Sequence, residues 1–338
     1  MKQQLSLIIK KLFLQIGVYG LIRKISPNQN ISILRYHAIV SPEDNFYTSP
    51  PIALSAVEFE AHVRYFAKYY NVLSLDEAVD IVRSGQTPPP NSVVFTFDDG
   101  YLDNLEAARL LNKYGANGTF YVVTEVMGRK TRFWLAEVTY LILKTGKPEL
   151  SITAADETFH FTLSDTSSRW KAIRTLVRLI KSNNRAVRDA VISQLVEQLG
   201  SDQLLQEVTD LMLDWSQVKQ MHEMGMVIAA HTLSHLNLPN ADPEDAQKEI
   251  SGAKAELEKQ LGKPCRHFSY PNSGPYEYFN ERIRQYVIDA GFDSSCTSNQ
   301  GFFHPQSDVF AIDRVRTVPE LAEVIHGMEW ERISGANK

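Results

Sequence analysis

Short apolar segments that are typical of buried strands alternate along the chain with amphipathic segments that are typical of helices. Strands are predicted at 31–36, 93–97, 118–123, 226–230, 266–270, 292–297 and 309–315. Helices are predicted at 55–70, 74–83, 103–114, 214–224, 242–261 and 279–290, with another from Pro319. Because strands that alternate with helices form parallel sheets with helical crossovers, this pattern predicts an α/β fold.

The alternation is interrupted at about 130–212. Here the pattern predicts a helix from Phe133, a hairpin at 150–163, and one long helix from Trp170 to Leu199 with apolar residues at helical spacing. We interpret this stretch as a mostly helical insertion in a single domain that covers residues 31–330.

The N-terminal segment, residues 1–30, differs in character from the rest of the chain. Its basic residues are Lys2, Lys10, Lys11, Arg23 and Lys24, and no acidic residue precedes Glu43. The apolar stretch 12–22 resembles the core of a signal peptide but lacks a cleavage site of small residues. We expect this segment to form one basic amphipathic helix.

Two interpretations of this helix stay open. In the first it binds an anionic membrane surface peripherally, which would place the protein on the cytoplasmic side. Salt would then release the protein, because each Lys or Arg near such a surface contributes about 1 kcal/mol. In the second interpretation the helix packs against the flank of its own domain. An uncleaved signal anchor, with the enzyme outside the membrane, is the alternative for its location.

Composition narrows the possible chemistry. The 338 residues carry a formal net charge of -5, which argues against a nucleic-acid binder. Two cysteines, Cys265 and Cys296, are too few for a disulfide framework or a four-thiolate zinc site. Any bound metal must therefore be held by His, Asp or Glu side chains.

Two adjacent acids, Asp98 and Asp99, follow the predicted strand 93–97 and precede Gly100. The carboxyl ends of parallel strands form the functional face of a sheet or barrel. Successive side chains at a strand end point in different directions, so one carboxylate could bind a metal while the other acts as a base. Taken alone, Asp-Asp-Gly fits a solvated turn better than a functional site, because this composition is ordinary in turns.

Two histidines, His231 and His235, follow the predicted strand 226–230. Their i,i+4 spacing is common among zinc ligands and would put both rings on one side of a helical turn. A single histidine is more often a packed or surface residue, but two at this spacing favour a metal site. With Asp99 they would form a set that leaves one position open for water or substrate.

A third segment, Phe-Ser-Tyr-Pro-Asn-Ser-Gly at 268–274, follows the predicted strand 266–270. Its proline and glycine give a rigid loop, which could direct a backbone N–H toward a developing oxyanion. The same composition is also typical of an ordinary turn.

Together these segments resemble the first three motifs of the polysaccharide deacetylases, which include chitooligosaccharide, chitin and peptidoglycan deacetylases. The matching residues are Thr-Phe-Asp-Asp-Gly at 96–100, His-Thr-x-x-His at 231–235 and Phe-Ser-Tyr-Pro at 268–271. Tyr36-His37 on the first strand also resembles the subgroup that acts on exopolysaccharides. The resemblance covers about 31–128 and 212–318, and it implies a distorted (β/α) barrel that hydrolyses N-acetyl groups on sugars with a divalent metal.

The resemblance also implies roles for the matching residues. Asp98 matches the general base, and the metal ligands are matched by Asp99, His231 and His235, with Zn²⁺ as the default metal. The loop that contacts the sugar and supplies the oxyanion donor is matched by Tyr270, Pro271 and Asn272. In this mechanism the metal polarises the acetamide carbonyl, and Asp98 deprotonates the attacking water.

The sequence departs from the family pattern at two points. Ser269 stands where the third motif normally has an arginine that orients the base, and Arg314 is our candidate replacement. The histidine that usually acts as general acid has no clear match. His37, at a strand end, is one candidate for this acid, and His304 and His326 are weaker candidates.

These observations predict an enzyme that removes N-acetyl groups from amino sugars of a bacterial surface polysaccharide or of its lipid-linked precursor. One alternative is a weak or silent glycan-binding homologue, and another is a metal amidase or esterase with a non-sugar substrate. The insertion also carries a basic run that fits a solvated helix face, or a surface for acidic glycan or lipid: Arg169, Lys171, Arg174, Arg178, Lys181, Arg185 and Arg188.

Overall fold

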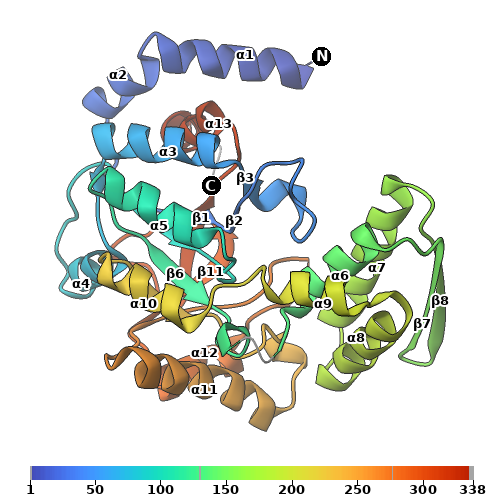
Figure 1. Ribbon diagram of the computed structural model, residues 1–338. Helices are drawn as coiled ribbons and strands as arrows, with labels where there is room; N and C mark the ends of the chain where they lie inside the picture. The colour runs from blue at the N-terminus through green and yellow to red at the C-terminus, as the bar shows by residue number, and fades with distance from the viewer. Residues whose placement is uncertain (1, 129–130, 276, 335–338) are drawn as a thin grey trace.

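The computed structural model describes residues 2–128, 131–275 and 277–334. Met1 and Lys130, where the predicted N-terminal segment and the predicted insertion begin, lie outside the described residues. A barrel of parallel strands forms the centre of the molecule and is surrounded by helices. The inserted residues form a separate lobe at one side of the barrel, and the N-terminal helices lie at the top (Figure 1).

Seven parallel strands close the barrel in the order β1-β12-β11-β10-β9-β6-β5, and β5 pairs back with β1. Their bounds are β1 (Ile31–Tyr36), β5 (Ser92–Phe97), β6 (Thr119–Val122), β9 (Val227–Ala230), β10 (His267–Ser269), β11 (Ser294–Gln300) and β12 (Ile312–Arg316). Outside the ring, β4 (Asn71–Val72) pairs with the start of β5. The predicted α/β class and the distorted (β/α) barrel are confirmed.

The barrel is distorted because its strands pair unevenly. β1 and β5 pair over six positions, whereas β9 and β10 share the single pair Ala230–Phe268. The β11–β12 register shifts between Cys296 and Gln300. Every residue of β5 is buried, since side chains fill the interior and helices cover the outside. This explains why the strand reads as a continuous apolar run rather than as an alternating one.

The helices that cover the barrel are α3 (Ala56–Tyr69), α4 (Leu75–Arg83), α5 (Asn104–Lys113), α10 (Trp215–Glu223), α11 (Pro243–Leu261), α12 (Glu281–Asp289) and α13 (Leu321–His326). Capping boxes begin α3 at Ser55, α4 at Ser74 and α10 at Asp214. Shorter elements are β2 (Ala38–Ile39), β3 (Ala53–Leu54), η1 (Pro50–Ile52), η2 (Val126–Gly128), η3 (Leu238–Asn240), η4 (Gly327–Glu331) and α14 (Arg332–Ser334).

The insertion folds around a hydrophobic core of its own, which includes Val138, Leu150, Leu176 and Leu195. It consists of α6 (Trp134–Lys144), the hairpin β7 (Glu149–Ala154) and β8 (Glu157–Thr162), α7 (Thr166–Lys181), α8 (Arg185–Leu199) and α9 (Asp202–Thr209). The single long helix predicted from Trp170 to Leu199 is wrong. The chain breaks after Lys181 because Asn184 caps a new helix by accepting a hydrogen bond from the Val187 N–H.

The predicted single N-terminal helix is also wrong, because α1 (Lys2–Gln15) and α2 (Val18–Ile25) are separated by Gly17 in a left-handed conformation (φ 81°). Both helices pack beside α13 and η4. The Tyr19 hydroxyl lies 3.0 Å from His326 Nδ1, and the buried Arg23 donates to the Tyr70 hydroxyl at 3.0 Å. No single described helix meets the length and hydropathy of a membrane span; Gln4–Gln15 and α2 do so only as a pair bent by 65°.

Candidate active site

The carboxyl ends of the barrel strands bring together residues that are far apart in sequence. His37 follows β1, Asp98 and Asp99 follow β5, and His231 follows β9. Arg314 projects from β12 toward the same point. The two aspartates and His231 are each only 2% exposed. Such buried polar side chains need partners, and most of these are found within the group.

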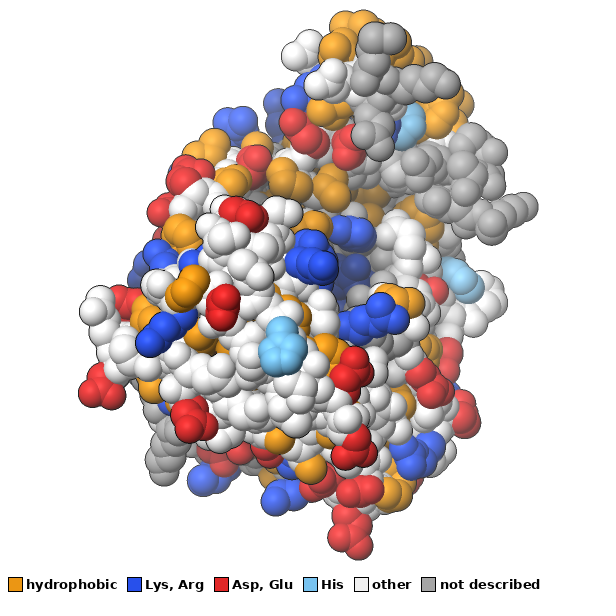
Figure 2. Space-filling model, turned by 90° about the vertical axis from the view of Figure 1, so that its right-hand side faces the viewer, with side chains coloured by type: hydrophobic (Ala, Val, Ile, Leu, Met, Phe, Trp, Pro, Cys, Tyr) orange, Lys and Arg blue, Asp and Glu red, His pale blue; other side chains and the backbone are white. Residues whose placement is uncertain are grey.

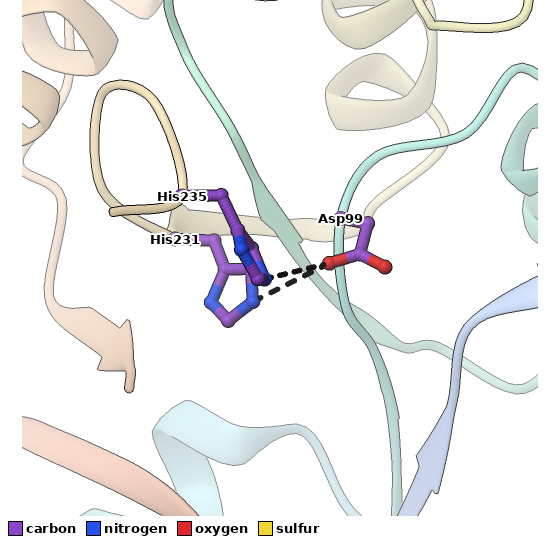
Figure 3. A group of neighbouring side chains, drawn as sticks. All are labelled: Asp99, His231 and His235. Carbon is purple, nitrogen blue, oxygen red and sulfur yellow. Dashed lines mark ion pairs between the residues drawn. The ribbon is translucent and has the colours of Figure 1, made fainter. Parts of the chain in front are cut away.

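The three predicted metal ligands converge (Figure 3). The Nε2 atoms of His231 and His235 each lie 3.5 Å from Oδ1 of Asp99. The candidate ligand atoms all lie within 4.8 Å of one another. Ligands around a tetrahedral zinc, with bonds of about 2.0–2.1 Å, are about 3.3 Å apart. The three side chains therefore fit a small divalent cation with little movement.

Hydrogen bonding and burial set the state of the two imidazoles. His231 Nδ1–H donates to the Ser269 carbonyl oxygen at 2.8 Å, which leaves the Nε2 lone pair directed at Asp99. Burial lowers the pKa of His235 to about 3. Both rings can thus present the neutral nitrogen that a metal requires.

The predicted helical turn at 231–235 is wrong, because Thr232 (φ 67°) and His235 (φ 56°) are left-handed and the segment is a loop. The Thr232 hydroxyl accepts a hydrogen bond from the His235 N–H at 2.8 Å. The Ser234 N–H donates to the buried Glu249 carboxylate at 2.8 Å. These bonds, rather than a helix, turn both imidazoles toward Asp99.

Backbone strain gathers at the same place. Asp99 (φ 79°) and Asn272 (φ 76°) join Thr232 and His235 among the non-glycine residues with positive φ. Each such residue costs of the order of 1–3 kcal/mol and persists only when surrounding contacts fix it. This concentration of strain is typical of a functional site.

Arg314 makes a bidentate ion pair with Asp98. Its Nη1 lies 2.7 Å from Oδ1 and its Nη2 lies 2.6 Å from Oδ2. Nη2 also donates to Ser269 Oγ at 3.1 Å, and Nε donates to the Thr297 carbonyl at 2.8 Å. The serine that departs from the family pattern and the arginine expected to compensate for it are therefore neighbours.

This pairing fixes the charge of Asp98. Burial alone would raise the pKa of its carboxyl, but the charge and hydrogen bonds of Arg314 outweigh burial and hold that pKa well below its usual value. The carboxylate is consequently ionised at neutral pH, which is the form that a general base requires.

The candidate acid His37 lies beside the base, with Nε2 at 3.8 Å from Asp98 Oδ2. Burial lowers the pKa of His37 to about 4, so its ring is uncharged at neutral pH. The weaker candidates lie elsewhere: His304 bonds with Gln306, and His326 contacts Tyr19 of the N-terminal helices.

The three residues of the predicted sugar-contact loop differ in what they can offer. The Tyr270 hydroxyl donates to the Phe310 carbonyl at 2.9 Å, and its N–H donates to the Cys296 carbonyl at 3.1 Å. The side-chain amide of Asn272 is buried, yet neither its oxygen nor its nitrogen has a hydrogen-bond partner among the described residues. Pro271 connects these two residues, so Asn272 is the one with polar side-chain atoms available for a ligand.

A cavity of about 750 Å³ lies over these residues. The barrel lines one side of it, and the loop 48–52 lines another. The insertion lines the third side with residues of α6 and α7: Leu135, Thr139, Ser167, Trp170, Ile173, Arg174, Val177 and Lys181. Figure 2 looks onto the insertion side of the molecule, where Lys and Arg side chains gather near a hollow in the middle of the face.

Sequence reasoning missed Arg35, which lines this cavity, and it named Lys181 only as a member of the basic run, not as a residue of the active site. Lys181 ends α7, and its carbonyl accepts hydrogen bonds from Asn237 at 2.7 Å and Asn240 at 3.0 Å, which hold the helix end against the barrel. Burial lowers the pKa of Lys181 to about 8, although the nearby Asp99 acts in the opposite direction. A signal was present, since Trp170, Arg174, Val177 and Lys181 share one face of a helix.

Other members of the basic run join the insertion to the barrel. Arg185 pairs with the buried Glu249 at 2.5 Å, and Arg188 donates to Ser234 Oγ at 2.9 Å. Both therefore contact the network that holds the loop 231–235. The predicted solvated helix face is wrong for these two residues.

Comparisons with known proteins agree with this geometry. Residues 85–295 match the polysaccharide deacetylase family model. The chain is 22% identical over 294 residues to YxkH of Bacillus subtilis (strain 168), a polysaccharide deacetylase by name, and the match covers 86% of this chain and 73% of YxkH.

Solved structures share the fold. The Streptococcus pyogenes deacetylase PplD, solved in complex with acetate, is similar with a TM-score of 0.58 and 20% identity, over 90% of this chain and 99% of PplD. The BpsB deacetylase domain of Bordetella bronchiseptica is similar with a TM-score of 0.53 and 14% identity, over 86% and 96% of the two chains. IcaB of Ammonifex degensii also has a TM-score of 0.53, with 17% identity over 88% and 98%. With a family model that matches more than half of its length, the chain belongs to the polysaccharide deacetylase family.

Proposed function

We propose that the protein is a metal-dependent deacetylase that removes N-acetyl groups from amino sugars of a bacterial surface polysaccharide or of its precursor. One observation carries the proposal. An ionised Asp98, held by the buried Arg314, lies next to the converging Asp99, His231 and His235 at one wall of a cavity of about 750 Å³. This combination offers a base, a metal site and room for a sugar in one place.

The metal would be held by Asp99, His231 and His235. Two imidazoles and one carboxylate are a donor set that suits Zn²⁺ and leaves a position open. When bound, the metal would supply Lewis acidity to the acetamide carbonyl oxygen and to the attacking water.

The chain's own residues perform the proton transfers. Asp98 takes a proton from water as the water oxygen bonds to the carbonyl carbon, and Arg314 keeps the carboxylate ionised and oriented. The side-chain amide of Asn272 would bind the sugar, and the backbone N–H of Asn272 would stabilise the oxyanion, because Pro271 has no N–H and the Tyr270 N–H is bonded to Cys296. The C–N bond then breaks, and the products are acetate and a free amine.

The departing nitrogen needs a proton, and the structure changes which donor we favour. Burial lowers the pKa of His37 to about 4, so its ring is uncharged at neutral pH and lacks the extra proton that a donor needs. Lys181, whose ammonium group can donate a proton, lines the same cavity as Asp98 and Asp99. We therefore assign the donor role to Lys181, and His37 becomes a neutral partner of Asp98 that can receive its proton.

Acetate release from N-acetylglucosamine oligomers, measured with and without a chelator, tests the proposal. We expect release that stops when the chelator removes the metal and returns when Zn²⁺ is added. Binding of the oligomers without acetate release would instead identify a silent glycan-binding homologue. Release from simple amides or esters, but not from the oligomers, would identify a non-sugar substrate.

A further inference from the structure

The exposed apolar side chains of the molecule are concentrated in one region. Of the twelve large apolar side chains exposed in the described part of the chain, seven lie on α1, α2 and their junction: Leu5, Ile8, Ile9, Leu12, Ile16, Leu21 and Ile25. Trp330 and Ile333, from the adjoining C-terminal elements, are exposed as well. We call these nine residues the apolar face. Exposed apolar side chains that cluster in one region usually mark a surface that is covered by something else.

The apolar face is held in place from behind. In α1 the exposed residues recur every three or four positions, whereas Phe13 and Leu14 pack against the core. Arg23, on the inner side of α2, is buried and donates to the hydroxyls of Tyr70 and Tyr65. Figure 2 shows hydrophobic side chains at the top of the molecule, where α1 lies in Figure 1. The face is therefore a fixed feature of the fold.

We propose that the apolar face inserts into the interfacial layer of a lipid bilayer, with α1 and α2 lying flat on the membrane. α1 spans about 21 Å at 1.5 Å per residue, which is too short to cross a hydrocarbon core of about 30 Å. The bend of 65° directs the next apolar segment away from the same axis. Exposed aliphatic residues with one tryptophan, and basic rather than acidic neighbours in the same segment, are typical of interfacial helices.

The structure changes the expected nature of this attachment. Arg23 is only 8% exposed and pairs with Glu329. Lys11 pairs with Glu320 at 2.8 Å, and Lys10 lies 3.8 Å from Glu323. Three of the five basic residues counted in the sequence are thus compensated by acids. Attachment therefore depends mainly on apolar burial, and we expect it to survive high salt, contrary to the expectation from the sequence alone.

Vesicle sedimentation of the full-length protein tests this inference independently of the proposed reaction. The vesicles are phosphatidylcholine alone, or an equal mixture with phosphatidylglycerol, each at low and high salt. We expect the wild type to sediment with the mixed vesicles at both salt concentrations. Ile8→Gln/Ile16→Gln should reduce binding roughly tenfold or more, because two apolar side chains are lost from the contact. The control Val57→Gln, which changes an exposed valine on α3, should bind like the wild type.

Trp330 reports insertion directly. Its fluorescence should shift to the blue when vesicles are added, and Trp330→Phe should abolish the shift. Complete release by high salt, wild-type binding by the double variant, or no binding to either vesicle would overturn the inference. A wild-type dimer that Ile8→Gln/Ile16→Gln converts to a monomer would also overturn it, since a second copy would then cover the face.

Discussion

The barrel and the insertion line the same cavity, but they contribute to it by different means. The barrel residues Asp98, Asp99 and His231 follow strand ends, and buried hydrogen bonds fix them further. The insertion contributes one face of α7, and the position of that face depends on how two hydrophobic cores dock. The barrel therefore holds the candidate catalytic and metal-binding side chains. The cavity wall that would contact the rest of the substrate belongs to the insertion, which has a hydrophobic core of its own.

Two contacts qualify this division. Arg185 and Arg188 of the insertion reach the Glu249–Ser234 network, which holds the metal loop. Lys181 lines the cavity from the insertion side. If the division holds, barrel variants should change turnover or metal binding, and variants of the α7 face should change substrate affinity more than metal content.

The largest effect is expected for Asp98→Asn. An amide cannot accept the proton of water, and general-base catalysis contributes roughly 10²–10⁴-fold to the rate. Acetate release should fall by this factor, while metal content and the unfolding temperature stay close to those of the wild type. A variant that deacetylates at the wild-type rate would place the base elsewhere.

His235→Ala should abolish metal binding. Removing a residue that only orients a metal-binding side chain lowers the affinity for the metal about 10–100-fold, and removing a metal-binding side chain itself lowers it more. Metal analysis of the purified protein measures this, with His304→Ala as the control, because His304 bonds only locally with Gln306. Equal metal content in His235→Ala and wild type would contradict the site.

Arg314→Ala should move the acidic limb of the pH–rate profile upward. Asp98 must be ionised to act, and a cation at hydrogen-bond distance lowers the pKa of a carboxyl by about 1–3 units. Without Arg314 the carboxylate becomes protonated at a higher pH, so activity is lost earlier as the pH falls. Kinetics over a range of pH measure the shift.

A second variant keeps this prediction testable, because Arg314 is buried and Arg314→Ala could misfold. The second variant combines Arg314→Ala with Ser269→Arg, which returns an arginine to the position that has one in the family pattern. This position is close to the present guanidinium, since Ser269 Oγ lies 3.1 Å from Nη2 of Arg314. We expect the acidic limb to return toward its wild-type position. If Arg314→Ala alone leaves the acidic limb of the pH–rate profile unchanged, Arg314 has only a structural role.

The smallest effects on metal content should come from the α7 face. Trp170→Ala removes an aromatic wall of the cavity, and we expect KM to rise by roughly tenfold with little change in metal content. Lys181→Met should lower kcat, since the donor to the departing amine is lost, whereas Arg178→Met, an exposed neighbour outside the cavity lining, should leave kcat unchanged. A Lys181→Met variant with wild-type kcat would return the donor role to another residue.

Much of the barrel could be predicted from the sequence, because its strands are buried on both faces and read as short apolar runs between capped helices. The candidate metal ligands Asp99, His231 and His235 could also be predicted, since few side chains can bind a metal and these three follow strand ends closely. The local conformation could not. The loop 231–235 resembled a helical turn in spacing alone, and only its bonds to Thr232 and Glu249 show how the imidazoles converge.

The sequence by itself determined the α/β class, the order of the strands along the chain and the residue types of the candidate metal site, because periodicity and ligand chemistry are local properties. The sequence named Arg314 as a candidate partner of Asp98, but only the tertiary structure decided that the two residues, 216 positions apart, form a bidentate contact. It also decided that Lys181 faces the cavity while Arg185 and Arg188 bind the barrel, although all three belong to one basic run. The direction of these side chains depends on how α7 and α8 pack against the barrel. The stability of that packing comes from surfaces contributed by several segments, so no single segment of sequence encodes it.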